Sequence, residues 1–327
     1  MRSLIYSYIY IFSAQEPLSN SISIGSSFTF KSGLSLTSSY SETVFHSTLN
    51  KFLVKMIWRF VLPVIWLMSL ASGYNYCNNK THRCVLKNRE HFMCRLEKFP
   101  AYGGKTKFHQ IVPDTSNFQE MVLDLLNSMR NRFASGELIT SENKTFAKAR
   151  RMRKLIWDKE LGYMARSHAS TVSFMRTECR STQRFAHVGE TPAVVIAKKK
   201  LDIKQICGKA FKTMFDEYLN VTDPFGLLHA FDAVRDYYVG HFTTIISDRA
   251  SRVGCGVAVG SNCLATNEFC YFVTCYFDFN NIQSSYVYKA GDPGSSCDDW
   301  GVHGSDKYPF LCKNSGQIYP HDHGHKW

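Results

Sequence analysis

The sequence of 327 residues lacks the short motifs that mark two large groups of hydrolases. It contains no Gly-x-Ser-x-Gly, the turn that presents a nucleophilic serine, and no His-Glu-x-x-His, the helical motif that binds a catalytic zinc ion. No uninterrupted apolar run reaches the ~18 residues that a membrane-spanning helix requires. We therefore expect no hydrolase of these two types. We also expect no integral membrane protein once the export signal at residues 56–73 has been cleaved, whereas an uncleaved signal would remain as an anchor.

Cysteine is abundant instead, with eleven residues, and the chain carries three Asn-x-Ser/Thr sequons, at Asn79, Asn143 and Asn220. Both features are typical of secreted, disulfide-bonded proteins that receive N-linked glycans. An export signal is recognisable at residues 56–73, where Arg59 precedes a short apolar run and small residues follow it. We therefore predict a secreted, extracellular protein, in which residues 1–55 are a gene-model extension or a disordered leader.

The charge balance of the chain is basic. Residues 1–73 contain five basic and two acidic side chains, so the formal net charge is +12 for the whole chain and +9 for the mature chain. A basic secreted protein is attracted to anionic glycans and to membrane surfaces. Two clusters, at residues 148–154 and 198–204, are candidates for such a patch, although a run of charge is more often an ordinary solvated face.

Hydrophobic periodicity predicts that helices come before strands. Apolar residues recur at three- and four-residue steps in three segments, which is typical of amphipathic helices. Three later runs are rich in β-branched and aromatic residues and are separated by Asp, Gly, Ser and Asn, which indicates consecutive antiparallel strands. The predicted helices cover residues 116–135, 151–175 and 203–219, and the predicted strands cover residues 241–246, 253–259 and 269–277.

The three predicted strands contain or adjoin motifs that are typical of one protein family. Gly240-His241-Phe242-Thr243, Val253-Gly254-Cys255-Gly256 and Phe272-Val273-Thr274-Cys275 resemble the motifs of the CAP superfamily, which includes cysteine-rich secretory, antigen-five and pathogenesis-related proteins. Residues 127–136, 157–161 and 185–191 resemble its earlier motifs, in the same order. The cysteine-bearing flanks are most similar to insect antigen-five proteins. The resemblance implies an α+β fold, a three-layer α-β-α sandwich with a central antiparallel sheet and disulfide staples.

The resemblance also implies a domain organisation. The CAP (SCP) domain is expected at residues 115–282, after a cysteine-bearing N-terminal extension at residues 74–114. A cysteine-bearing tail follows at residues 283–327 and ends in His321-Asp322-His323-Gly324-His325. Alternate histidines can capture a transition metal weakly, but without folded support we expect no physiological site there.

The cysteines are consistent with this family. By resemblance to antigen-five proteins, Cys77 pairs with Cys94, Cys84 with Cys179, and Cys255 with Cys275. Proximity in the sequence suggests that Cys263 pairs with Cys270 and Cys297 with Cys312. Cys207 is then left over, and its place in an apolar helical pattern favours a buried free thiol.

Many CAP proteins have two histidines and two glutamates in a cleft, where some bind a divalent metal. The equivalent positions here are Glu190, Glu217, His241 and, in place of the other histidine, Arg176. Arginine is cationic and cannot bind a metal, so we expect no cofactor and an ion network in which Arg176 bridges the two glutamates. Two more residues are candidates for the cleft: His187 as a substitute imidazole, and Ser247, which stands where the family usually has tryptophan and should reshape the cleft edge.

These observations favour a secreted, non-catalytic CAP protein of the antigen-five type that acts as an extracellular binding or effector module. We expect a monomer whose partner is an extracellular protein, glycan or lipid, and not a nucleic acid. One alternative is a lipid or sterol carrier that uses the aromatic stretches at residues 225–238 and 271–279. A weaker one is a metal-dependent hydrolase, in which His241 and either Glu190 or Glu217 serve as base and orienter and Ser247 or Thr243 serves as nucleophile.

Overall fold

The computed structural model describes residues 75–78, 84, 89–264 and 268–318. The chain divides into two compact units, Met1–Gly73 and Tyr74–Trp327, and all described residues belong to the second. The predicted leader and signal peptide, the sequon at Asn79 and the histidine-rich end lie outside the described residues. No helix in the described part of the chain has the length and hydrophobicity of a membrane span.

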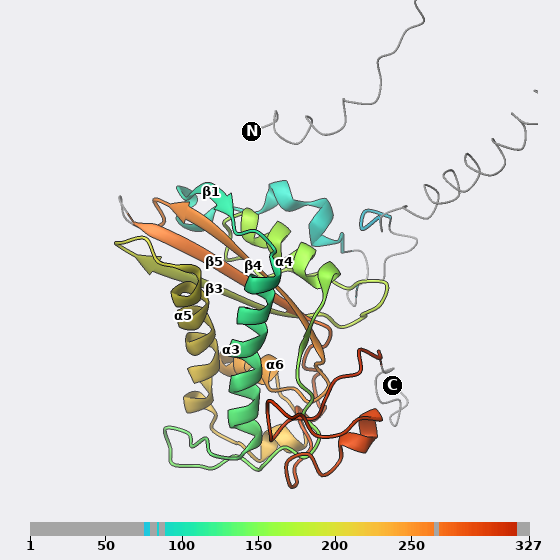
Figure 1. Cartoon of the computed structure of the whole chain (residues 1–327). Helices are drawn as coiled ribbons and strands as arrows, with labels where there is room; N and C mark the ends of the chain where they lie inside the picture. Colours follow the sequence, from blue (N-terminus) through green and yellow to red (C-terminus); the bar gives the residue numbers. More distant parts are fainter. Residues whose placement is uncertain (1–74, 79–83, 85–88, 265–267, 319–327) are drawn as a thin grey trace, which may run out of the picture. The chain divides into compact units, whose positions relative to one another are not determined.

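A mixed sheet forms the middle layer (Figure 1). Four strands pair antiparallel in the order β1 (Lys107–Ile111), β4 (Arg252–Ser261), β5 (Phe269–Phe277) and β3 (Gly189–Ala197). The short strand β2 (Ile156–Trp157) runs parallel to the start of β4. Because β4 and β5 are central and covered on both faces, nearly all of their residues are buried.

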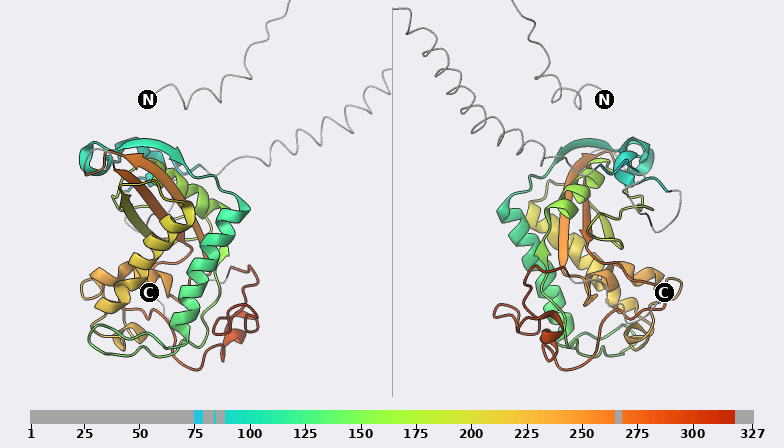
Figure 2. Two further views of the ribbon diagram at one scale, coloured as in Figure 1. Left: turned by 60° about the vertical axis from the view of Figure 1, so that its left-hand side comes forward. Right: turned by 90° about the vertical axis from the view of Figure 1, so that its right-hand side faces the viewer.

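Helices cover the two faces of this sheet (Figures 1 and 2). On one face α3 (Ser116–Ala134), α5 (Ile203–Phe215) and α6 (Gly240–Ile245) share the main core with the sheet. On the other face lies α4 (Lys159–Ser170), whose backbone approaches β4 so closely that a Cβ at Gly254 or Gly256 would collide with it. The predicted three-layer α-β-α sandwich is therefore confirmed.

The predicted helix at residues 151–175 is wrong at both ends. Residues 151–155 bridge to the C-terminal tail instead, through the pairing of Arg153 with Cys312. α4 begins only after Asp158, whose carboxylate accepts the amide hydrogens of Glu160 and Leu161 as an N-cap. It ends before Val172, which has a φ of 48° and cannot continue a right-handed helix.

The other two predicted helices are close to those observed, as α3 and α5. The last residues of the segment predicted at 203–219 form a separate 3-10 turn, η6 (Asp216–Asn220). The strands at 253–259 and 269–277 are confirmed as β4 and β5, whereas β1, β2 and β3 were not predicted as strands.

The predicted strand at residues 241–246 is wrong, because this segment forms helix α6. Its β-branched residues favour strands by propensity, but tertiary contacts override that preference. Thr243 and Thr244 donate their hydroxyl hydrogens to the carbonyls of Val239 and Gly240, four residues earlier, which satisfies both side chains within a helix. A carboxylate from another element, described below, caps the first amides of the helix.

Five disulfides staple the domain, and they are the five expected pairs. They join Cys77 to Cys94, Cys84 to Cys179, Cys255 to Cys275, Cys263 to Cys270 and Cys297 to Cys312. Cys207 lies on α5 as a buried free thiol, and burial raises its pKa to about 12. The tail is pinned to the domain because the indole of Trp300 donates to the carbonyl of Arg151 at 2.7 Å.

Candidate functional site

Three side chains from separate elements form a chain of hydrogen bonds at the candidate cleft. His241 stands in the first turn of α6, Glu217 in η6, and Arg176 in the loop after α4. The ring Nδ1 of His241 lies 2.6 Å from Oε1 of Glu217, and its Nε2 lies 2.9 Å from Nη2 of Arg176. Since a guanidinium only donates, Nε2 must accept, which places the ring proton on Nδ1, where it is donated to Glu217.

Glu217 also holds the helix that carries His241. Its Oε2 accepts the backbone amide hydrogens of His241 at 2.9 Å and Phe242 at 3.0 Å. One carboxylate therefore binds two first-turn amides of α6 that have no partner within the helix, and it also fixes the orientation of the imidazole. The side chains of His241 and Glu217 are 16 % and 19 % exposed, so the pair can be reached from solvent.

Glu190, at the start of β3, faces a different set of partners in the interior. It accepts the amide and hydroxyl hydrogens of Thr177 at 3.0 and 2.9 Å, and the hydroxyl hydrogen of Tyr276 at 3.1 Å. Nδ1 of His168 lies 3.2 Å away, and the guanidinium of Arg180 lies 3.8 Å away. Burial opposes ionisation, but the hydrogen bond from His168 and the charge of Arg180 outweigh it and hold the pKa of Glu190 at about 2.

The predicted ion network is therefore wrong in its connections. Arg176 does not bridge the two glutamates; it contacts the imidazole of His241, while Glu190 faces the guanidinium of Arg180 and the ring Nδ1 of His168. Sequence reasoning missed His168. The signal was present, because His168 falls four residues after Met164 and next to Ala169 on the buried face of α4.

The two additional cleft candidates lie elsewhere. His187 lines a separate pocket of 350 Å³ together with Arg180 and Asn281, and burial, with the charge of Arg249, lowers its pKa. Ser247 is completely buried and not at an open edge; its carbonyl oxygen accepts from the guanidinium of Arg130 at 2.9 Å. Neither side chain is part of the hydrogen-bonded chain at His241.

The nucleophile candidates and the two aromatic stretches, which the alternative functions would use, are either buried in the core or exposed on the surface. The hydroxyl of Thr243 is buried and donates to a helix carbonyl, and that of Ser247 finds no hydrogen-bond partner among the described residues. The aromatic stretch at 271–279 belongs to the core, in and just after β5. In the other stretch Phe225, Tyr237 and Tyr238 are 67 %, 71 % and 76 % exposed.

Glu217 also lines an open pocket of 780 Å³. Tyr238 and Arg235 form part of its wall, and Asn220 of the third sequon lies at it. Asn220 and Asn143 are both exposed, which an acceptor of an N-linked glycan requires. Glycosylation at these positions stays a prediction.

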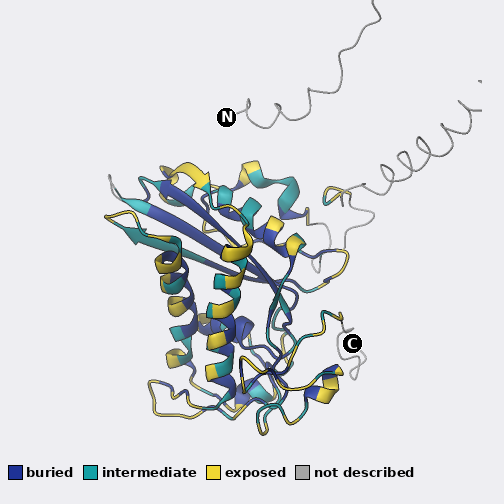
Figure 3. Cartoon of the chain, in the orientation of Figure 1, coloured by how far each residue is buried: buried dark blue, intermediate teal, exposed yellow. Residues whose placement is uncertain are grey.

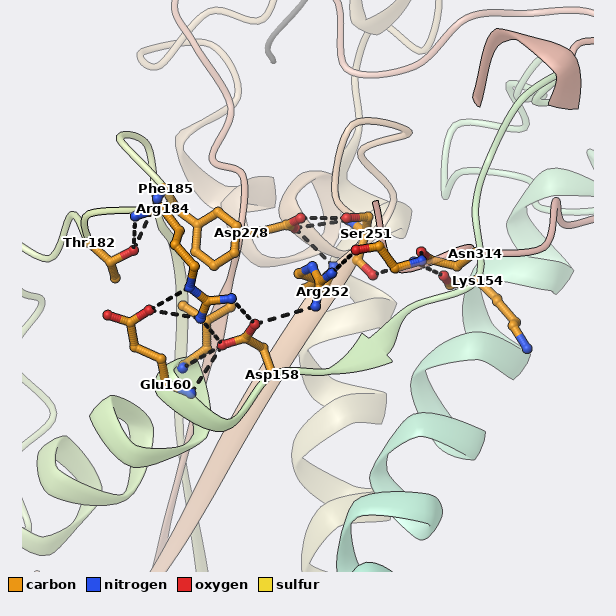
Figure 4. Close-up of polar contacts among 12 residues, drawn as sticks. Lys154, Asp158, Glu160, Thr182, Arg184, Phe185, Ser251, Arg252, Asp278 and Asn314 are labelled. Carbon is orange, nitrogen blue, oxygen red and sulfur yellow. Dashed lines mark hydrogen bonds and ion pairs between the residues drawn. The ribbon is translucent and has the colours of Figure 1, made fainter. Parts of the chain in front are cut away.

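A cluster of ion pairs anchors the loop that carries Arg176 and Arg180 (Figure 4). Arg184 donates to both carboxylate oxygens of Asp158, at 2.8 and 2.7 Å, and to Glu160 at 2.9 and 2.7 Å. Asp158 is at the same time the N-cap of α4 and lies 3.5 Å from the guanidinium of Arg252 on β4. One carboxylate thus connects loop, helix and sheet.

The described residues contain no group of three or more His, Cys, Asp or Glu side chains arranged to hold a metal ion. At His241 both ring nitrogens are engaged, one by a carboxylate and the other by a cation. A metal ligand needs a lone pair on nitrogen that is free to face the ion, so this donor set does not fit a metal as it stands.

Comparisons with known proteins agree with this architecture. Residues 123–277 match the family model described as "CAP: Cysteine-rich secretory protein family". The chain is 31 % identical to "Antigen 5 like allergen Cul n 1" of Culicoides nubeculosus over 60 % of this chain and 90 % of that protein. It is 27 % identical to "Venom allergen-1" of Aedes albopictus over 70 % of this chain and 85 % of that protein.

One solved structure, that of BmVAL-1, shares the fold with a TM-score of 0.51 and 20 % identity, over 62 % of this chain and 96 % of the other. The residues that match the family model contain strands β2 to β5, helices α4, α5 and α6, and most of α3, whereas β1 precedes them. They also include Arg176, Glu190, Glu217 and His241. The chain belongs to the CAP family of cysteine-rich secretory proteins and resembles its venom-allergen and antigen-five members.

Proposed function

We propose that this protein is a secreted, non-catalytic CAP module that acts in the extracellular space by binding. The observation that carries the proposal is the contact between Arg176 and Nε2 of His241. A histidine that acts as general base or metal ligand must present an unprotonated nitrogen to its substrate or ion. Here that nitrogen faces a permanent cation, and the other one donates to Glu217.

The buried residues support the same conclusion. Glu190 is enclosed by Thr177, Tyr276, His168 and Arg180, so it is not a carboxylate that could activate water at the surface. The family relationship and the five disulfides support an extracellular location.

The test is a zinc titration of the full-length secreted protein by calorimetry, with His321, His323 and His325 replaced by alanine so that the tail contributes no signal. We expect no stoichiometric binding. Arg176→His should create binding, because it replaces the cation with a second imidazole beside His241. Adding His241→Ala to that variant should abolish the gain.

Stoichiometric zinc binding by the protein with Arg176 intact, lost in His241→Ala, would refute the proposal and restore a metal-dependent activity as the leading hypothesis. A folding control is needed for each variant, and far-ultraviolet circular dichroism with thermal unfolding provides it.

A further inference from the structure

The two basic clusters in the sequence differ in how far their charged side chains are exposed in the fold. In the cluster at 148–154, Arg151 and Arg153 are each only 4 % exposed. Arg151 pairs with Asp248 and Asp299 at 2.9 Å, and Arg153 stacks over the ring of Trp300 at 3.8 Å. These two arginines are paired or packed within the fold and offer little charge to a partner, which leaves Lys148 as the exposed lysine of this cluster.

The cluster at 198–204 is exposed and gains further lysines from another strand. Lys198, Lys199 and Lys200 follow directly after β3, and all three are exposed. The pairing register places Ala197 opposite Phe269, Phe269 opposite Ser261, and Ser261 opposite Lys107. The end of β3 and the start of β1 therefore lie at the same end of the sheet, on its two opposite edges (Figure 1).

We call this end of the sheet the basic rim. Its members share exposure to solvent, and none of them forms an ion pair with a residue that the structure describes. They are Lys105, Lys107, Lys198, Lys199 and Lys200. Figure 3 marks residues at the turn after β3 and in β1 as exposed.

The basic rim concentrates positive charge over a short span. Neighbouring strands lie about 4.8 Å apart, so its two groups of lysines are separated by about 14 Å across the β4–β5 hairpin. The described acidic side chains next to it are Asp202, the N-cap of α5, and Glu268 of the hairpin. At physiological salt the screening length is about 8 Å, so the fields of the lysines overlap within each group but not between the two groups. This arrangement favours a long ligand whose successive negative charges can contact both groups.

We propose that the basic rim binds a sulfated polysaccharide, a linear polyanion of the extracellular matrix or cell surface. The inference rests on the proposed extracellular role, since anionic lipids are concentrated on the cytoplasmic leaflet, which a secreted protein does not meet. The exposed large apolar side chains here, Phe108 at 38 % and Leu264 at 69 %, are two scattered residues and not the apolar face of a membrane anchor. Lysine ammonium groups act as point charges, which suits a flexible chain of sulfates.

The test measures binding of the full-length secreted protein to heparin, a soluble sulfated polysaccharide, by heparin-column elution and by calorimetry at increasing salt. We expect retention that weakens with salt. Lys198→Gln/Lys199→Gln/Lys200→Gln should lower the affinity about tenfold or more, and Lys105→Gln/Lys107→Gln should lower it further in combination. The matched control removes the same charge from exposed lysines elsewhere, as Lys148→Gln/Lys159→Gln/Lys209→Gln, and should change the affinity less than about twofold.

Equal losses in the two triple variants would overturn the proposal, because binding would then depend on net charge alone. Absence of heparin binding by the folded protein would overturn it too, as would stronger binding to phosphatidylcholine–phosphatidylserine vesicles or to duplex DNA than to heparin. His241→Ala should leave heparin binding unchanged. Failure here would therefore be distinguishable from failure of the cleft proposal, which the zinc titration decides.

Discussion

Glu217 holds His241 in two ways at once: Oε1 accepts the ring Nδ1 hydrogen at 2.6 Å, and Oε2 accepts the backbone amide hydrogen of the same residue at 2.9 Å. The side chain that orients the imidazole is thus also the cap of the helix that carries it. Cleft geometry and local stability are coupled through this one carboxylate.

Replacing Glu217 with glutamine should therefore destabilise the fold. The neutral amide cannot accept both the ring hydrogen and the α6 amides as strongly, so we expect the free energy of unfolding to fall by about 1–2 kcal/mol. Urea unfolding at neutral pH measures the change. Asp216→Asn is the matched control, because Asp216 makes only a surface pair with Lys212 one turn earlier and should cost less than about 0.5 kcal/mol. Equal effects of the two changes would contradict the capping role.

The buried carboxylate of Glu190 should make stability depend on pH in the acid range. Its pKa is lowered from 4.5 to about 2 in the folded protein. A lowered folded-state pKa contributes stability above the unfolded value, and this contribution is lost as pH falls from about 4.5 towards 2, by about 3 kcal/mol in total. Urea unfolding at a series of pH values in this range measures the slope.

Glu190→Gln is the control for that slope. The variant should be less stable at neutral pH, because His168 and Arg180 lose their charged partner, and its stability should change less between pH 4.5 and 2. An unchanged acid slope in the variant would show that other carboxylates cause it.

The ion pairs of Arg184 with Asp158 and Glu160 should contribute more to the free energy of unfolding than an ordinary surface ion pair does. Arg184 forms a bidentate contact with a carboxylate, that of Asp158, which is only 3 % exposed. Arg184→Lys keeps the charge but loses the fork geometry, so we expect a loss of about 1–3 kcal/mol in the free energy of unfolding. Arg89→Lys tests the opposite case, since Arg89 and Glu178 are half exposed and their pair should contribute less than about 1 kcal/mol. Similar losses in both would argue against a loop anchor at Asp158.

The thiol of Cys207 should not react with alkylating reagents in the native protein. Burial raises its pKa to about 12, so little thiolate is present at neutral pH, and the thiol is not accessible. Iodoacetamide should leave the native protein unmodified and add one group after denaturation without reduction. Mass spectrometry counts the added groups, and Cys207→Ala should add none. More than one group on the denatured wild type would mean that one of the five disulfides is missing.

Much of the architecture could be predicted from the sequence because the signals are local. The apolar period of α3 and α5 appears within single segments, and β4 and β5 are continuous runs rich in β-branched and aromatic residues, as buried strands usually are. Three of the cysteine pairs followed from a resemblance that rests on ordered motifs, and the other two followed from proximity in the sequence. The periodicity of these helices and strands can be recognised without knowing which distant segments of the chain are in contact.

The candidate site and the basic rim depend on contacts between distant segments, which only the tertiary structure shows. Residues 241–246 have strand-like composition, yet they form a helix because Glu217, 24 positions away, caps their amides. The guanidinium of Arg176 contacts His241 and not Glu190, whose carboxylate is enclosed by Thr177, Tyr276, His168 and Arg180. Lys107 joins the lysines after β3 only through strand pairing across the sheet. Sequence patterns report which residues are buried, but long-range hydrogen bonding and register determine which charges become neighbours.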